Sequence, residues 1–217
     1  MLTRDDRTVP DCLELLDGIA DLGLRHIGFK DVGAPRETLA ELNRRIKRLG
    51  ATSYLEVVSL SPAECRAAAR LAREIAVDCL LGGGDPHGMQ EEVAGTATRF
   101  FPFAGGPEGH PTRLRGDAAR IAADCRRCEA LGCAGIDLLA YRAVEAAPLE
   151  LVREARAALR GRLIVAGSVD TPLRIAELAA AGADAFTIGS ALFNGRFAPG
   201  RPSLRGQLDA VLAHCDR

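Results

Sequence analysis

Short apolar segments of strand length alternate with amphipathic segments of helical period along almost the whole chain. Seven strands are predicted, at His26–Asp31, Ser53–Val58, Ala76–Gly82, Arg99–Ala104, Ile136–Tyr141, Leu163–Ser168 and Ala185–Ser190. Each of them is followed by a helical pattern, and several of these helices have a proline near their start, where a missing N–H does no harm. This alternation is typical of βα units that build a parallel sheet.

A closed eight-stranded barrel needs one more strand, and it must precede the helix that begins near Pro10. An open doubly wound sheet is the alternative fold. The regular rhythm, ending with a helix at Leu204–Cys215, favours closure. We therefore predict an α/β protein, a single small (β/α)₈ TIM-barrel domain over residues 1–217. Its first strand is short or truncated: either the chain has lost residues there, or Met1–Arg4 supply a short strand.

Charge and hydropathy exclude two classes of partner. The chain has 28 basic and 29 acidic residues, interspersed along its length, so no basic surface for nucleic acid is expected. The longest apolar stretches have strand length, and the first residues, MLTRDDRTVP, do not resemble a signal peptide. We expect a cytoplasmic protein without a nucleic-acid or membrane partner, and the sequence leaves homo-oligomerisation open.

The seven cysteines lack the spacing of a disulfide scaffold. Cys125 and Cys128 form a CxxC pair, but the surrounding DCRRCEALGC is predicted to be one helix. No second pair or nearby histidine completes a set of four metal ligands. We predict free thiols on a buried helix face, no metal and no organic cofactor.

The ends of the last two predicted strands carry matched glycine–serine pairs. They are Gly167-Ser168 in VAGSVDTP and Gly189-Ser190 in TIGSALFNGRF. Glycine lets the backbone N–H groups approach a ligand closely, and the serine hydroxyls add donors, as a phosphate dianion requires. The ends of strands 7 and 8 are a frequent phosphate site in this fold, so a phosphorylated small molecule is the predicted ligand.

The same region resembles a known family. Residues Leu163–Phe197 look like the strand 7 to strand 8 segment of the ribulose-phosphate-binding barrel superfamily. GSALFNGRF is similar to the GxALYxGRF ending of the phosphoribosylformimino isomerase and cyclase of histidine biosynthesis. By that resemblance Gly167, Ser168, Gly189 and Ser190 are phosphate ligands. Those enzymes use aspartates on strands one and five, whereas strand five here, RFFPFAGG, has none, so their reaction is not expected. The glycine-rich Gly82–Gly88 is either a second anion site, as the half-barrel symmetry of the superfamily implies, or a bare loop.

Lys30 is one of only two lysines, the other being Lys47 on a predicted helix. In HIGFKD the apolar Ile27 and Phe29 alternate with Lys30, so Lys30 is predicted to point into the barrel. An amine there can bind an anion as a point charge or form a Schiff base with a carbonyl substrate if desolvation lowers its pKa.

Two carboxylates complete the set of predicted catalytic residues. Asp137 falls on the same inward face as Thr187 and could serve as a general acid or base, or hold a strand end. Glu56 is less certain, because two alignments of its strand assign it to opposite faces.

Three hypotheses of function follow. The first is an enzyme that isomerises, epimerises or cleaves a small phosphorylated sugar or keto compound by acid/base chemistry. The second is a Schiff-base aldolase, lyase or condensing enzyme that uses Lys30. The third is a non-catalytic phosphometabolite-binding protein. Paired carboxylates opposite Gly189 would favour the first, and an isolated desolvated amine would favour the second.

Overall fold

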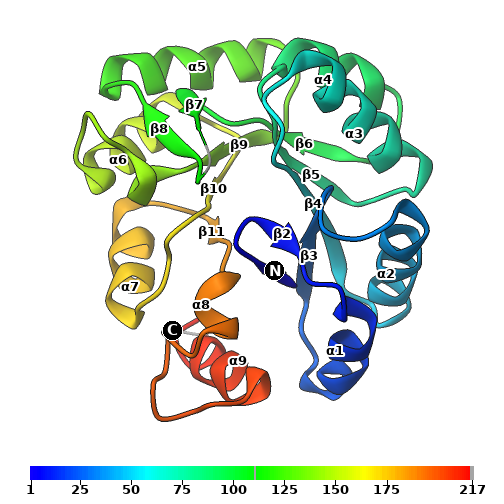
Figure 1. Ribbon diagram of the computed structural model, residues 1–217. Helices are drawn as coiled ribbons and strands as arrows, with labels where there is room; N and C mark the ends of the chain where they lie inside the picture. Colours follow the sequence, from blue (N-terminus) through cyan, green and yellow to red (C-terminus); the bar gives the residue numbers. More distant parts are fainter. Residues whose placement is uncertain (110, 216–217) are drawn as a thin grey trace.

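The computed structural model describes residues 1–109 and 111–215, with strands at the centre and helices around them (Figure 1). One four-stranded parallel sheet has the order β3 (His26–Lys30), β4 (Thr52–Val57), β5 (Cys79–Gly82), β6 (Arg99–Phe101). A three-stranded parallel sheet consists of β9 (Gly135–Leu138), β10 (Arg162–Val165) and β11 (Ala185–Phe186), with β10 in the middle. These seven strands match the seven predicted ones, which confirms the fold class.

Backbone contacts join the two sheets on both sides. On one side Phe103 bridges Asp137 in parallel, and the Asp137 N–H donates to Pro102 O at 2.8 Å. On the other side the Leu2 N–H donates to Gly28 O at 2.7 Å, and the Met1 nitrogen donates to Ile188 O at 2.9 Å. The first residues therefore occupy the place of the short first strand.

Beyond this point the chain forms the antiparallel pair β1 (Thr3–Arg4) and β2 (Arg7–Thr8) near the C-terminal strand ends. The N–H of Thr8 donates to Val32 O, and its hydroxyl donates to Lys30 O and accepts from the Lys30 N–H. These bonds hold the small hairpin against the end of β3.

The helices follow the strands as the sequence rhythm requires. They are α1 (Cys12–Gly18), α2 (Arg36–Arg48), α3 (Pro62–Glu74), α4 (Pro86–Val93), α5 (Ala118–Ala130), α6 (Pro148–Ala158), α7 (Pro172–Ala181), α8 (Ser190–Phe193) and α9 (Leu204–Leu212), with short 3-10 turns η1 (Ala20–Leu22) and η2 (Ala140–Arg142). Ser61, Asp117, Thr171 and Ser203 cap four of them by accepting a backbone N–H, as such residues do at helix starts. No helix of the described residues is long and apolar enough to cross a membrane.

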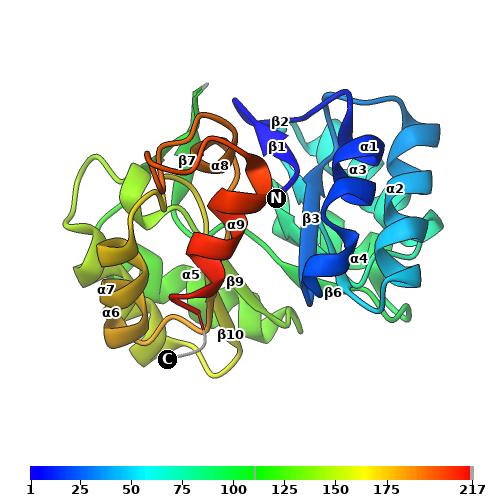
Figure 2. The same cartoon turned by 90° about the horizontal axis from the view of Figure 1, so that it is seen from below.

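The apolar core has three parts. One cluster packs the helices against β3 to β6 and a second packs those against β9 to β11. Figure 2 shows the two halves side by side, blue to cyan and green to red. A small third cluster of Cys79, Leu81, Phe101 and Ile164 fills the barrel interior, so the lower barrel is packed and the space for a ligand lies at its ends.

The hairpin that follows β6 was not predicted. After β6 the chain forms the antiparallel hairpin β7 (Gly106–Glu108) and β8 (Arg113–Arg115). The segment between β6 and α5 is rich in glycine and proline and reads as a loop. Leu114 of this hairpin bridges Ala143, so β8 contacts the loop that carries Arg142.

Candidate functional site

A cavity of about 160 Å³ lies at the C-terminal ends of the strands. Its polar lining comes from two groups of residues. Asp6, Lys30, Glu56 and Arg142 form a charged group, and Gly167, Ser168, Gly189 and Ser190 line another part of the same cavity. The structure thus brings together the predicted phosphate-binding residues and two of the three predicted catalytic residues.

Lys30 ends β3 and is only 6% exposed. Its Nζ lies 2.8 Å from Asp6 Oδ1 and 3.0 Å from Glu56 Oε1. Burial alone would lower the pKa of Lys30, but the two carboxylates outweigh it, so the pKa is raised and the ammonium stays charged. The inward direction of the side chain agrees with the alternation of the strand.

Asp6 was not predicted as a site residue. It lies in the turn between β1 and β2, where Asp5 and Asp6 have φ values of 50° and 57°, and aspartate tolerates this left-handed conformation. Arg142 holds both oxygens of Asp6, at 3.0 Å and 3.1 Å. Burial opposes ionisation of Asp6, but the hydrogen bonds and charges of Arg142 and Lys30 hold its pKa well below the usual range. In the sequence, the pair Asp5-Asp6 before the first helix was the signal that could have indicated a site residue here.

Arg142 lies in η2, directly after β9, and its guanidinium turns inward to Asp6. It also donates to Thr112 O at 3.4 Å, beside the unpredicted hairpin. Burial tends to lower the pKa of Arg142, but Asp6 outweighs it and raises that pKa. Arg142 is therefore a fixed positive charge that links the charged cluster to the β7–β8 hairpin.

Glu56 points into the barrel. Of the two alignments of its strand, which assign Glu56 to opposite faces, the one that places it inward is therefore correct. It pairs in register with Lys30 on the neighbouring strand and is 5% exposed. Side chains directly opposite on neighbouring strands lie on the same face, so the close approach of Glu56 to Lys30 follows from the register.

Asp137 also points inward but lies deeper, level with Ile164 of β10. It is fully buried, and neither of its carboxylate oxygens has a hydrogen-bond partner among the described residues. Burial and the nearby charge of Glu56 raise its pKa well above the usual range, although Lys30 and Arg142 act in the opposite direction. The environment of Asp137 therefore favours the neutral, protonated form of its carboxyl group.

The glycine–serine pairs lie where the sequence predicted, and each glycine also has a packing role. A Cβ at Gly167 would lie 2.5 Å from Arg142 Nε, and one at Gly189 would lie 2.9 Å from Thr3 O. Ser168 has a φ of 57°, and Ser190 Oγ accepts the Asp5 N–H at 2.9 Å.

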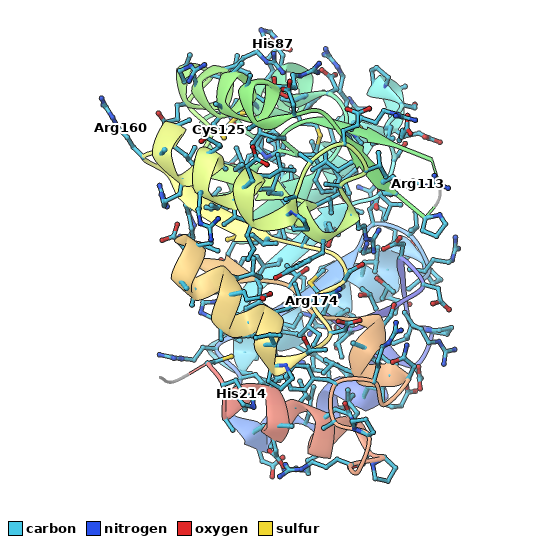
Figure 3. The ribbon with its side chains drawn as sticks, turned by 90° about the vertical axis from the view of Figure 1, so that its left-hand side faces the viewer. His87, Arg113, Cys125, Arg160, Arg174 and His214 are labelled. Atoms are coloured by element: carbon cyan, nitrogen blue, oxygen red, sulfur yellow. The ribbon has the colours of Figure 1, made fainter. Side chains whose placement is uncertain are left out.

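Two arginines lie near these pairs. Arg174, which belongs to the first turn of α7 and is labelled in Figure 3, bonds Asp170 at 2.7 Å, and Arg196 lies 3.6 Å from the same carboxylate. Asp170 and Arg196 both line the cavity. Arg196 is largely exposed and can pair with an anion that enters the cavity.

The glycine-rich Gly82–Gly88 does not form a second anion cradle of this kind. A Cβ at Gly82 would lie 2.8 Å from Phe103, and one at Gly84 would lie 2.7 Å from Leu60 O. At the start of α4 the Asp85 carboxylate accepts the Gly88 N–H at 3.1 Å and thus takes the place that an anion would need. The glycines are there for close packing.

The cysteine pair lies on a buried face of α5, as predicted. Cys125 and Cys128 are buried and both are free thiols. Among the described residues, no group of three or more His, Cys, Asp or Glu side chains is arranged to hold a metal ion.

Comparison with known proteins gives the fold but no family. No family model and no curated protein sequence matches the chain. Solved structures match along nearly its whole length. Orotidine 5'-phosphate decarboxylase from Pyrococcus horikoshii OT3 has 14% identity and a TM-score of 0.64 over 93% of this chain and 91% of that one. The chain is a (β/α)₈ barrel.

Two further barrel structures show the same likeness. The native KDPGal structure has 13% identity and a TM-score of 0.65 over 95% of this chain and 91% of that one. The BexX/CysO complex from Amycolatopsis orientalis has 17% identity and a TM-score of 0.61 over 94% of this chain and 84% of that one. At such identities the barrel fold is shared, and function must be argued from the site.

Proposed function

We propose that this barrel is a cytoplasmic enzyme that isomerises, epimerises or cleaves a small phosphorylated sugar or keto compound by acid/base chemistry. One observation carries the proposal: a single cavity joins the glycine–serine strand ends to a buried cluster in which Lys30 bridges Asp6 and Glu56. An anion-binding end next to paired carboxylates is the arrangement that proton transfer on a phosphorylated substrate needs.

The phosphate group would bind at Gly167-Ser168 and Gly189-Ser190. Backbone N–H groups and serine hydroxyls at these strand ends are suitable donors for a dianion. The resemblance of Leu163–Phe197 to the ribulose-phosphate-binding barrels supports the assignment. So does the structural neighbour named for a 5'-phosphate substrate.

The carbonyl end would extend from the phosphate toward β3 and β4. Glu56 would accept a proton from the carbon next to the carbonyl, and the C–H electron pair would form a double bond while the carbonyl oxygen gains negative charge. The Lys30 ammonium, kept charged by its two carboxylates, would stabilise that oxygen. Return of the carbon-bound proton to the former carbonyl carbon gives an isomer, provided that the hydroxyl on the deprotonated carbon passes its own proton to the oxyanion and becomes the new carbonyl.

Asp137 would be the acid partner of this pair. It keeps a proton one layer deeper, beside Glu56, whose charge helps to raise its pKa. A neutral carboxylic acid next to an ionised one allows the two groups to give and take a proton in turn. Asp6 would not exchange protons at neutral pH, because Arg142 and Lys30 hold it ionised, and its role would be to orient both cations.

The proposal predicts exchange of a carbon-bound hydrogen. In D₂O near neutral pH, dihydroxyacetone phosphate, ribulose 5-phosphate and fructose 6-phosphate would each be incubated with the protein and followed by ¹H NMR. We expect enzyme-dependent loss of a C–H signal in at least one of them. Glu56→Gln should slow it at least a hundredfold, in the usual range for general acid/base groups. Glu91→Gln, on the exposed face of α4, is the matched control and should leave the rate unchanged.

Each rival hypothesis has its own outcome in the same system. Phosphate binding without exchange in any substrate would favour the non-catalytic binding protein. The Schiff-base reaction would leave a covalent mass at Lys30 after borohydride reduction. We expect none, because a neutral amine is required and the carboxylates keep Lys30 charged. Lys47, paired with Asp78 on the outer surface, serves as the internal control for nonspecific labelling.

A further inference from the structure

A second, larger cavity lies at the opposite end of the barrel. It has a volume of about 440 Å³ and is lined by the N-terminal residues of β3, β10 and β11 together with parts of α7 and α9. Its apolar wall includes Leu24, Ile175, Leu178, Leu204, Leu208 and Leu212. We call it the basal groove. Its volume is within the range of small-molecule sites.

The basal groove exists because the first strand is short. The backbone of Met1 hydrogen-bonds Ile188, and that of Leu2 hydrogen-bonds Gly28. These bonds close the barrel wall between β3 and β11 only in the part nearer the C-terminal strand ends. Below that level both His26–Ile27 of β3 and Asp184–Phe186 of β11 line the groove. Removing apolar surface from water is favourable, so a ligand whose apolar part covers this wall is stabilised there.

The polar residues of the basal groove are mainly basic. Arg25, His26 and Arg162 line it, and the Tyr54 hydroxyl lies 3.0 Å from His26 Nδ1. Burial, followed by the charges of Arg162, Arg25 and Arg99, lowers the pKa of His26. The positive charge there at neutral pH therefore belongs to the arginines.

The acid in the lining does not cancel this charge. Asp184 Oδ2 is held at 2.7 Å by Arg156, which lies outside the groove lining, and also accepts the Leu163 N–H. An apolar groove with a cationic end is complementary to one chemical class: an apolar tail with a negatively charged head.

We propose that the basal groove binds an anionic amphiphile. Its head, a carboxylate or a phosphate monoester, lies against Arg162, and its apolar tail runs along α7 and α9. The lining of this site shares only Met1, Thr187 and Ile188 with that of the strand-end cavity, and the proposal does not depend on the function proposed above. An extended peptide that pairs with the free edges of β3 and β11 is the competing occupant.

Calorimetric titration with four ten-carbon probes below their micellar concentrations tests the proposal. Decanoate and decyl phosphate should each bind once per chain and at least tenfold more tightly than decanol, and decyltrimethylammonium should not bind. The tighter of the two anions assigns the head group. Equal affinity for decanol, or no binding of either anion, would overturn the proposal.

Variants place the ligand. Arg162→Gln should weaken decanoate binding at least tenfold, because it removes the charge and leaves the backbone of β10 intact. Arg160→Gln is the matched control, since Figure 3 shows Arg160 pointing away from the protein. Ala179→Leu, on the groove side of α7, should also weaken binding by filling space for the tail. Unchanged affinity in both Arg162→Gln and Ala179→Leu, or a crystal structure with a peptide in the groove, would contradict the assignment.

Discussion

At the scale of single residues, the role of each carboxyl group in the site depends on whether it has a charged or hydrogen-bonding partner. Asp6 has two cations that hold its pKa low, whereas the Asp137 carboxylate has no hydrogen-bond partner among the described residues and burial raises its pKa. The neighbouring carboxyl groups of Asp137 and Glu56 thus have different environments. This difference assigns Asp137 as the acid and Glu56 as the base. The sequence predicts Lys30 from strand alternation and Asp137 from its alignment with the inward face of Thr187, but it could not predict Asp6, whose role depends on a turn far from Arg142 in sequence.

Asp137→Asn separates catalysis from stability. An amide keeps the shape and the neutrality of the native side chain, and no hydrogen bond is lost. Because the folded pKa of Asp137 is raised, the native protein loses stability as pH rises above about 3.9, the unfolded value, toward that raised pKa. The Asp137→Asn variant has no such pH-dependent loss of stability. We therefore expect it to be at least as stable as the parent at pH 7 in urea unfolding. Its turnover should fall at least a hundredfold.

Asp209→Asn, on exposed α9, is the control for that comparison and should change neither quantity. A variant with full activity would remove Asp137 from the proposed mechanism. One that is several kcal/mol less stable at pH 7 would show that its carboxylate is ionised and partnered in the native protein.

At the scale of elements, the strand–helix alternation is sufficient to predict seven strands, but not their ends. β11 has only two residues, Ala185–Phe186, and β5 begins at Cys79 because Ala76 adopts a φ of 55°. The β7–β8 hairpin escaped prediction because turn-forming residues dominate it. These differences matter for the site, because Ser168 lies in a loop beyond β10 and Ser190 begins the short helix α8, and the hydrophobic period does not determine backbone conformation at either place.

Asp31 gives a pH test at this scale, because it links two strand ends. Its Oδ1 accepts the Val58 N–H at 3.0 Å, just after β4, and burial raises its pKa to about 6. Between the unfolded value near 3.9 and the folded value near 6, the unfolded chain binds fewer protons, so this residue makes stability fall as pH rises. The loss amounts to ~3 kcal/mol across that window.

Asp31→Asn keeps the acceptor and removes the titration. We expect the stability difference, variant minus parent, to increase from pH 4 to pH 6.5 and then to level off, as measured by urea unfolding at each pH. A difference that stays constant across this range would show that Asp31 titrates at its ordinary pKa.

At the scale of the whole molecule, the two outer core clusters raise the question of one or two folding units. Leu55 belongs to the cluster of the first half and Leu163 to that of the second, and both are fully buried. The halves share wall contacts at Asp137 and at Met1, whose nitrogen donates to Ile188 O. We predict that Leu55→Ala and Leu163→Ala each cost about 2–5 kcal/mol and lower the Tm of one common transition by roughly 5–15 °C. Scanning calorimetry that resolves a second, unshifted transition would mean that the halves unfold separately.

The central claim is that the ends of β10 and β11 hold a phosphate group beside the Lys30 cluster. The most direct measurement is a crystal structure of the protein in the presence of inorganic phosphate. The account predicts an anion within hydrogen-bonding reach of the backbone N–H groups of Gly167-Ser168 and Gly189-Ser190. A phosphate bound elsewhere, with these four residues free of it, would contradict the account.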